Sequence, residues 1–293
     1  MMLLAAFIWG TTFVAQRVGM EYIGPFLFNS LRFLMGAAVV WIFKRLFQKN
    51  GRFTFDRTHI KGGVFMGLAL FSAITFQQWG LVYTTAGKGG FITGLYVVFV
   101  PIAGMLVGKK SGAGHFAGAL LSLLGMYLLS VKTGLYMEKG DFLVFLGAVC
   151  WTIHVLLVDS YTTLGEPLTL AFLQFLVTSF LSFPLALIFE HAGIMNIKTA
   201  LPYILYAGVL SSGVAYTLQV ISQKFTHHSH AAIILSLESV FAAIAGYIVL
   251  SERFTEREVM GGILMILGMI VSQIYTSLYD NRKRVEFLTG RSK

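Results

Sequence analysis

The sequence contains little charge. Charged residues make up only 12% of the 293 positions, whereas an ordinary soluble domain carries about 25%. Hydrophobic residues make up 56%, and the mean hydropathy is +0.76. A soluble chain of this length would need more polar surface to cover its core, so much of the apolar surface is expected to face lipid. The composition therefore excludes a soluble globular domain and predicts an integral membrane protein.

Cysteine is nearly absent, and so are the motifs of ATP-driven chemistry. The single residue Cys150 excludes an intrachain disulfide and a metal site built on paired cysteines. The segment from Gly104 to Lys110 reads Gly-Met-Leu-Val-Gly-Lys-Lys, which departs from the phosphate-binding loop in its spacing and in its final residue. ATP hydrolysis by that route is excluded, and no cofactor is expected.

Long apolar runs are what the sequence has instead. Because about 20 apolar residues make one membrane crossing, we predict ten spans, at approximately 2–20, 26–43, 62–83, 89–107, 114–131, 141–159, 168–189, 200–222, 231–250 and 258–278. The connections are short, so no soluble catalytic module is expected. The first span has neither a basic leader nor a small-residue cleavage site, and it is not expected to be a signal peptide. The predicted class is an all-α integral membrane protein.

The formal charge of +9 is explained by topology. If both termini are cytoplasmic, fourteen Lys and Arg fall in cytoplasmic segments and six fall on the opposite side, in accord with the positive-inside rule. We therefore expect a multi-pass protein of the cell (plasma or inner) membrane with both termini in the cytoplasm, and no nucleic-acid partner. The basic tail, with Arg282, Lys283 and Arg284, is expected to be solvated or to touch anionic membrane lipid.

The chain matches itself at one offset. Residues 142 apart align as Trp9 with Trp151, Pro25 with Pro167, Gln77 with Gln219, Gly104 with Gly246, and Leu31-Arg32-Phe33-Leu34 with Leu173-Gln174-Phe175-Leu176. Each unit contains five predicted spans, an odd number, so the second unit would enter the membrane from the opposite side. Such inverted repeats are typical of secondary transporters. We predict repeats at 1–135 and 136–279, followed by the basic tail at 280–293.

Several segments carry a family resemblance. They are Trp9-Gly10-Thr11-Thr12-Phe13-Val14, Pro25, Leu31-Arg32-Phe33, Gly94-Leu95-Tyr96-Val97-Val98-Phe99-Val100-Pro101, Ala231-Ala232, Leu237-Glu238-Ser239-Val240-Phe241-Ala242-Ala243 and Leu250-Ser251-Glu252-Arg253. With them the chain resembles the EamA-like family of the drug/metabolite transporter (DMT) superfamily over nearly its whole length. Ser239 stands where that family usually has proline, and Ser251 where it often has glycine. The resemblance implies ten helices, cytoplasmic ends and metabolite transport, but it names no substrate.

Glu238 is an ionisable residue within a predicted span. Such groups are costly in hydrocarbon and normally face protein, water or a partner. Glu238 lies about 10 Å into the span at 231–250, since each residue adds about 1.5 Å. The matching position of the first repeat is Tyr96. The pair is expected to face a cavity between the repeats, where Glu238 would bind substrate or couple a proton. The alternative is that Glu238 makes one structural hydrogen bond between helices.

His154 and Arg32 are two further ionisable candidates. His154 lies well inside a predicted span and titrates in a range that suits proton coupling, although a buried neutral histidine bonded to a backbone carbonyl is a common alternative. Arg32 would bind an anionic group of a substrate, or its long side chain would extend to the lipid headgroups. A bound anion would favour carboxylate or phosphate substrates.

The remaining candidates are polar or aromatic residues inside the predicted spans. They are Trp9, Thr12, Thr75, Gln77, Gln78, Trp79, Thr93, Trp151, Tyr216 and Gln219. The amides would contact a polar solute or hold helices together, and the two matched tryptophans would stack on substrate or pack. The histidines His227, His228 and His230 are interpreted as a solvated loop, so no metal site is expected.

These features together predict a secondary carrier. It would export a small metabolite such as an amino acid by alternating access through a central cavity between the repeats. Energy would come from a coupling proton, through Glu238 or His154, or from the solute gradient alone. A membrane enzyme acting on lipid-type substrates is one alternative, but the intramembrane ionisable groups are few and scattered, so no enzyme is expected. A non-transporting membrane subunit or receptor is the other alternative.

Overall fold

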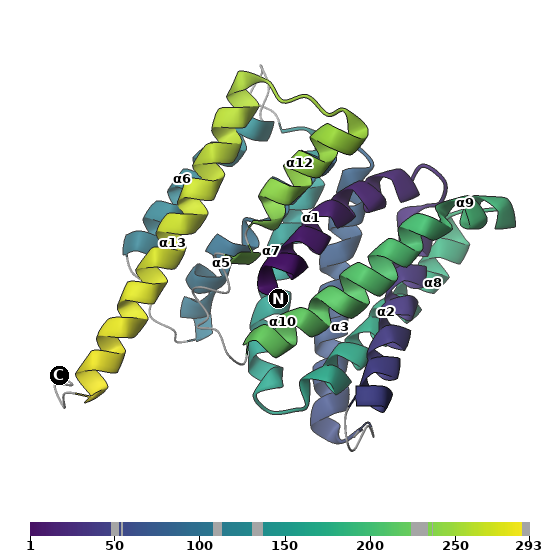
Figure 1. Ribbon diagram of the computed structural model, residues 1–293, viewed down its shortest axis with the longest axis horizontal. Coiled ribbons are helices and arrows are strands. Elements are labelled where there is room, and N and C mark those ends of the chain that lie inside the picture. The colour runs from purple at the N-terminus through teal and green to yellow at the C-terminus, as the bar shows by residue number, and fades with distance from the viewer. Residues whose placement is uncertain are drawn as a thin grey trace.

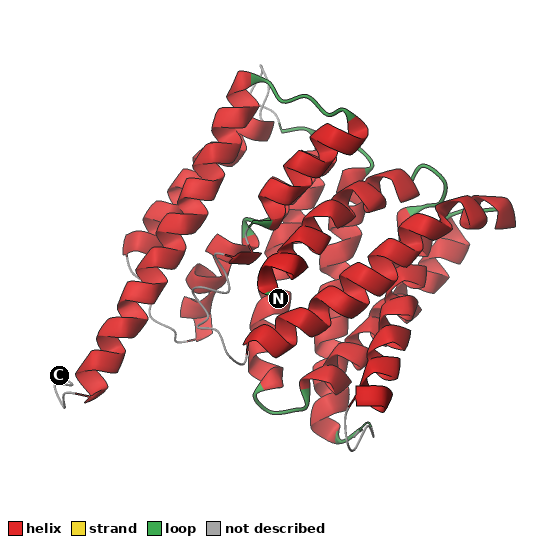
Figure 2. Ribbon diagram, viewed as in Figure 1, coloured by secondary structure: helices red, strands yellow, loops and turns green. Residues whose placement is uncertain are grey.

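The computed structural model is a bundle of helices packed side by side (Figure 1). It describes residues 1–47, 53, 55–107, 113–130, 137–223, 234–235 and 237–288. Within these ranges the elements are helices joined by loops, as Figure 2 shows. The all-helical class predicted from the apolar runs is confirmed.

Six helical segments are long and apolar enough to cross a membrane. They are α1 (Met2–Gly19), α2 (Pro25–Phe47), α3 (Arg57–Leu81), α7 (Lys139–Thr162), α8 (Pro167–Phe189) and Ile194–Gln219, which comprises α9 (Ile194–Leu205), η2 (Tyr206–Ala215) and part of α10 (Tyr216–Gln223). Shorter apolar helices occupy Ala86–Val100, Phe116–Leu129 and Glu238–Leu250. The prediction of a multi-pass membrane chain is confirmed, whereas the count of ten spans stays a prediction.

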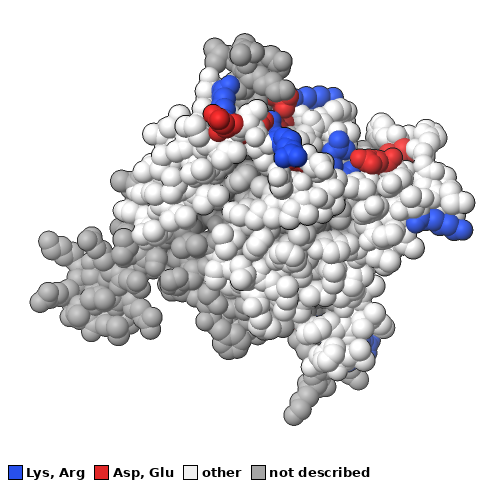
Figure 3. Space-filling view, turned by 45° about the horizontal axis from the view of Figure 1, so that its top comes forward, with Lys and Arg blue, Asp and Glu red and all other residues white. Residues whose placement is uncertain are grey.

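The outside of the bundle is largely apolar. Exposed large hydrophobic side chains occur on many helices and include Leu3, Phe65, Phe180 and Ile248. On the face drawn in Figure 3, the charged side chains of the described residues gather toward one end, and the described part of the flank below them is almost entirely uncharged. Such a flank suits hydrocarbon, because ionised side chains are costly there.

Two of the predicted spans depart from a regular α-helix. The span predicted at 89–107 is divided into α4 (Ala86–Thr93), α5 (Tyr96–Ala103) and the 3-10 helix η1 (Gly104–Val107). The break falls at Gly94, where an added Cβ would lie 2.5 Å from the Ser239 hydroxyl oxygen of α12 (Glu238–Leu250). The span predicted at 200–222 contains η2, a π-helix, and π-helical turns are frequent at functional sites.

Helices α2 and α8 run antiparallel. At one end the Glu190 carboxylate, just after α8, accepts hydrogen bonds from the backbone amides of Phe26 (2.7 Å) and Leu27 (2.9 Å) at the start of α2. At the other end the Lys44 ammonium, near the end of α2, lies 2.5 Å from the Glu166 carboxylate that precedes α8. Partial burial raises the pKa of Glu190 despite the two amides. Glu166 also accepts hydrogen bonds from the backbone amides of Leu168 and Thr169, so each helix start is capped by a carboxylate.

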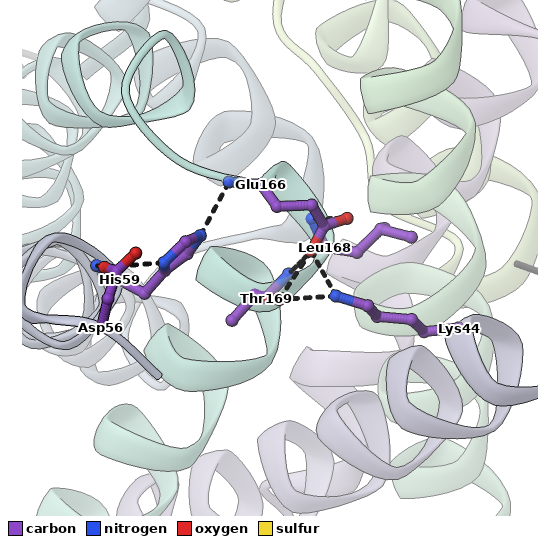
Figure 4. Close-up of polar contacts among 6 residues, drawn as sticks. All are labelled: Lys44, Asp56, His59, Glu166, Leu168 and Thr169. Carbon is purple, nitrogen blue, oxygen red and sulfur yellow. Dashed lines mark hydrogen bonds and ion pairs between the residues drawn. The ribbon is translucent and has the colours of Figure 1, made fainter. Parts of the chain in front are cut away.

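The Lys44 end also includes the start of α3 (Figure 4). Glu166 Oε2 accepts hydrogen bonds from the Thr169 hydroxyl (2.6 Å) and from the Lys44 ammonium. The Glu166 backbone amide donates to His59 Nε2 at 2.9 Å, and His59 Nδ1 lies 2.9 Å from Asp56 Oδ1. An imidazole that accepts at Nε2 must be unprotonated there. The network therefore joins α2, α3 and α8 at one end of the bundle.

Glu166→Gln is expected to destabilise the protein in a pH-dependent way. Desolvation raises the pKa of Glu166, but hydrogen bonds from Lys44 and Thr169 outweigh it and hold the pKa below its ordinary value of 4.5. Because the side chain is 33% exposed, screening limits the contribution to about 1 kcal/mol, or roughly 2–4 °C in unfolding temperature. A carboxylate with a depressed pKa stabilises above its ordinary pKa, and this contribution is lost as the pH falls through the folded value. Thermal unfolding of both proteins between pH 3 and 7 tests this, and a difference that persists undiminished at pH 3 would contradict it.

Helices α6 (Ala113–Ser130) and α13 (Glu256–Leu288) pack backbone to backbone. A Cβ added to Gly118 would lie 2.6 Å from the Gly268 carbonyl oxygen, and one added to Gly125 would lie 2.5 Å from the Gly261 carbonyl oxygen. Small residues allow such close approach in membranes, where association depends on packing contacts. The two helices are therefore antiparallel neighbours whose distance is set by glycine.

Candidate functional site

Glu238 and Tyr96 meet at the starts of two helices. Glu238 is the first residue of α12 and Tyr96 is the first residue of α5. Their side chains are joined by a hydrogen bond, and Glu238 is only 5% exposed. A helix N-terminus carries a partial positive charge that favours a nearby carboxylate. The two residues matched by the sequence repeat are thus brought into contact, with Glu238 buried and Tyr96 half-buried.

Helix α1 packs against this pair and carries Trp9 beside Tyr216. A Cβ added to Gly10 would lie 2.6 Å from the Glu238 carbonyl oxygen, so α1 closely approaches the start of α12. Trp9 Nε1 donates to the Ser211 carbonyl at 3.1 Å. The Trp9 ring is 5.3 Å from the Tyr216 ring in an edge-on arrangement. The indole is therefore fixed by η2 and α10.

Arg32 is buried without full hydrogen bonding. It is 5% exposed, and its Nε and Nη1 atoms have no hydrogen-bond partner. The guanidinium carbon lies 4.7 Å from the Phe33 ring centroid, a contact worth about 2 kcal/mol when desolvated. Each unpaired donor costs about 1–3 kcal/mol, and an arginine within a span costs about 2.5–3.5 kcal/mol even on insertion scales. The aromatic contact therefore does not compensate for the burial of this cation.

Tyr216 is near enough to both Arg32 and the Glu238–Tyr96 pair to interact with each. It interacts electrostatically with Arg32, with Glu238 and with Tyr96. We call Trp9, Arg32, Tyr96, Tyr216 and Glu238 the central cluster. It combines one cation, one carboxyl group and three aromatic side chains from α1, α2, α5, α10 and α12. The central cluster therefore contains hydrogen-bond donors, an acceptor and flat apolar surfaces.

A chain of amides lies along α1, α3 and α7. Trp151 Nε1 donates to Gln77 Oε1 at 2.6 Å, and Gln77 Nε2 donates to Gln16 Oε1 at 3.4 Å. His154 Nε2 lies 2.8 Å from the side-chain oxygen of Gln174, and the rings of Trp151 and His154 are 5.3 Å apart. His154 thus pairs with an amide side chain through Nε2, not with the backbone carbonyl considered from sequence. Its Nδ1 has no hydrogen-bond partner.

The other sequence candidates are more dispersed. Thr12 donates to the carbonyl of Ile8 in its own helix at 2.5 Å. Buried polar atoms of Thr75, Gln78 and Thr93 have no hydrogen-bond partner. Gln219 is half-buried on α10. Trp79 is 41% exposed on the outside of α3, so the structure does not bring it to the central cluster.

Four polar residues near these groups are not among the sequence candidates. They are Gln16, Asn29, Gln174 and Ser212, all buried. A signal existed for each, because each is a polar residue within an apolar run. Gln174 also aligns with Arg32 in the repeat. Asn29 and Ser212 both carry buried atoms without hydrogen-bond partners.

A hollow of about 400 Å³ opens at the end of the bundle opposite Lys44. Its lining residues are Arg17, Glu21, Val82, Tyr83, Thr84, Thr85, Lys88, Glu138, Leu250 and Glu252. The Lys88 ammonium lies 2.7 Å from Glu258 and 3.7 Å from Glu138. Glu252 accepts hydrogen bonds from the backbone amides of Ala86 (2.6 Å) and Gly87 (3.0 Å). Ion pairs and a capped helix start therefore hold the helices together around this hollow.

Metal ligation was not expected from the sequence. Among the residues that the structure describes, no group of three or more His, Cys, Asp or Glu side chains could hold a metal ion. His227, His228 and His230 lie outside the described residues, so their interpretation as a solvated loop stays a prediction.

Comparison with known proteins identifies the family. The sequence profile of the EamA-like transporter family matches the chain twice, at residues 1–131 and 138–273. The chain belongs to the EamA-like transporter family. The resemblance seen in the sequence is confirmed. Family membership makes the chain a membrane transporter and implies a small-molecule substrate.

Relatives of this EamA-like protein are similar over most of their length. An uncharacterized transporter of Archaeoglobus fulgidus is 35% identical over 269 residues, which cover 92% of this chain and 83% of the relative. The uncharacterized transporter YoaV of Bacillus subtilis is 25% identical over 293 residues, covering 94% and 95%. A solved crystal structure superposes with a TM-score of 0.68 at 18% identity, covering 94% of this chain and 96% of that one. At that identity the superposition establishes the fold alone.

Proposed function

We propose that this EamA-like protein is a secondary carrier that exports a small metabolite, such as an amino acid, by alternating access through a central cavity. One observation carries the proposal. Glu238 and Tyr96, the first residues of two helices, share a hydrogen bond, and Glu238 is closed off from solvent. Carriers bind substrates and coupling ions where discontinuous helices end near the bilayer midplane.

Two inverted five-helix repeats, at 1–135 and 136–279, are part of the proposal. The family profile matches once in each half, and α2 and α8, equivalent at the offset of 142, run antiparallel. The glycine contacts of α6 and α13 add support. Gly118 and Gly261 are 143 residues apart, as are Gly125 and Gly268. Gly118 contacts Gly268, which is the repeat equivalent of Gly125, and Gly125 contacts Gly261, which is the repeat equivalent of Gly118. A twofold axis produces such a reciprocal pattern.

The two ends of the bundle supply contacts that alternating access would break in turn. Lys44 and Glu166 fasten one end, and Lys88 and Glu258 fasten the other. In the proposed cycle, one ion pair separates while the other holds, so the central cluster opens to one side at a time. The Lys44 end would face the cytoplasm, with both termini on that side of the cell membrane, in accord with the positive-inside rule.

Glu238 and His154 are the proposed coupling groups. Both are buried ionisable side chains within apolar helices, where such groups commonly relay protons. Proton coupling predicts that a pH gradient across the membrane changes flux. Movement down the solute gradient alone predicts that it does not.

Metabolite profiling followed by flux measurement tests the carrier. Medium from cells that overexpress the protein is expected to gain one or a few metabolites relative to medium from deletion cells. The purified protein in proteoliposomes is then expected to carry the same compounds across the membrane unchanged. A chemically altered product would favour the membrane enzyme, and absence of flux for every enriched compound would favour a receptor or subunit.

A further inference from the structure

One face of α2 carries unpaired polar groups in the interior. Asn29, Arg32 and Gly36 are three and four residues apart, so they share this face. Both polar atoms of the Asn29 side chain lack a hydrogen-bond partner, as do Nε and Nη1 of Arg32. All three groups are buried. Polar groups in a membrane interior normally have partners, because no water is there to replace them.

The π-helix η2 packs directly against this face. A Cβ added to Gly208 would lie 2.9 Å from the Arg32 carbonyl oxygen, and one added to Gly36 would lie 2.6 Å from Ser212 Cβ. The Ser212 hydroxyl is buried and also lacks a partner. Tyr216, four residues further on, interacts electrostatically with Arg32. Buried polar groups without partners therefore lie on both of these packed elements, Asn29 and Arg32 on α2 and Ser212 on η2.

This cation has no counter-ion among the residues that the structure describes. No hydrogen bond or ion pair joins Arg32 to a carboxylate among these residues, and the carboxyl group of Glu238 is hydrogen-bonded to Tyr96 instead. A buried arginine is retained where it faces a partner, a cavity or a ligand. A guanidinium fork can donate two parallel hydrogen bonds to an oxyanion, and the Asn29 amide and the Ser212 hydroxyl supply further unpaired donors on the packed elements α2 and η2.

We propose that Asn29, Arg32 and Ser212 form a binding site for the carboxylate of the transported solute. The inference rests on the proposed carrier function and deepens it, because it makes a free carboxylate an obligatory part of the substrate. One arginine balances the single charge of a carboxylate, whereas a phosphate ester carries about −1.5 to −2 at neutral pH and would leave excess negative charge in the apolar interior. The rest of the solute lies toward Tyr216, Tyr96 and Glu238.

Thermal unfolding of the purified full-length protein with defined probes tests the site. The probes are the proteinogenic L-amino acids, acetate, lactate and succinate, each with its carboxamide, and glycerol 3-phosphate. At least one free acid is expected to raise the unfolding temperature, while its carboxamide does not. Arg32→Gln is expected to weaken the binding of that acid by about thirtyfold or more. Arg32→Lys is expected to weaken it by about tenfold, because lysine keeps the charge but loses the planar guanidinium fork. The exposed Arg45→Gln on the same helix is the matched control and should bind as the wild type does.

The variants without ligand separate a binding role from a structural one. An uncompensated buried cation destabilises the empty protein, so Arg32→Gln should unfold at the wild-type temperature or higher; a structural arginine would give a lower temperature. The proposal is overturned if no free acid stabilises the protein, if acid and carboxamide act equally, if only glycerol 3-phosphate acts, or if Arg32→Gln binds normally. Flux measured in proteoliposomes distinguishes failure of the proposed carrier function from failure of the proposed carboxylate site. Carboxylate binding through Arg32 without flux refutes the carrier, and flux of solutes without a carboxylate refutes the site.

Discussion

Glu238→Gln is expected to lower the flux of the transported solute at least about tenfold and to flatten its dependence on pH. Glutamine keeps the shape of the side chain and can still accept a hydrogen bond from Tyr96, but it carries neither a charge nor a titrating proton. A hydrogen bond to a charged group is worth about 1.5–3 kcal/mol, and each 1.4 kcal/mol is a factor of ten. Initial flux rates in proteoliposomes, measured across a series of pH values, give both quantities.

Glu256→Gln provides the matched control, because Glu256 is an exposed carboxylate in the first turn of α13. It should transport as the wild type does. Tyr96→Phe removes only the hydroxyl that pairs with Glu238, so it should change the pH dependence more than the maximal flux. Wild-type flux with an unchanged pH response in Glu238→Gln would refute the coupling role.

Gly261→Ala and Gly125→Ala are expected to destabilise the protein strongly. An added Cβ at Gly261 would lie 2.6 Å from the Gly125 carbonyl oxygen, and the reverse approach is 2.5 Å. Backbone atoms cannot rotate out of the way, so α6 and α13 must move apart. Alanine favours a helix over glycine by about 1 kcal/mol, but overpacking costs about 1–3 kcal/mol or more, and a clash with backbone belongs at the upper end. The expected result is an unfolding temperature lower by several degrees.

Gly193→Ala is the control that distinguishes the clash between α6 and α13 from a general effect of replacing glycine by alanine on the unfolding temperature. A Cβ at Gly193 meets only the Asn196 side-chain oxygen, at 3.6 Å. This variant should unfold close to the wild-type temperature. An unchanged or raised unfolding temperature in Gly261→Ala would show that helix propensity outweighs the close approach of α6 and α13.

Much of the helical architecture was predictable because apolar runs are local in sequence. The span predicted at 26–43 lies within α2, and the span predicted at 168–189 coincides with α8 to within one residue. The break at Gly94 and the π-helix η2 were not predicted, because they depend on what packs against them. Ser239 leaves no room at Gly94, and α2 closely approaches η2 at Gly208. Neither contact is visible in a local pattern.

The sequence selected many residues of the candidate site but indicated few of the hydrogen bonds between them. The repeat offset matched Tyr96 with Glu238, and these two share a hydrogen bond in the structure. Intramembrane polarity selected Gln77 and Trp151 but gave no sign that they bond to each other. It also selected Trp79, which points away from the cluster because it lies on the outer face of α3.

The sequence by itself determined that the chain is helical, resides in a membrane and resembles the EamA-like family. These properties follow from composition and local order, since every apolar residue adds to the cost of leaving lipid and every motif is contiguous. Only the tertiary structure decided which buried polar groups are satisfied. Glu238 has a partner while Arg32 retains two unpaired donors. The physical reason is that a hydrogen bond requires two groups within about 3 Å, and here these groups come from helices far apart in the chain.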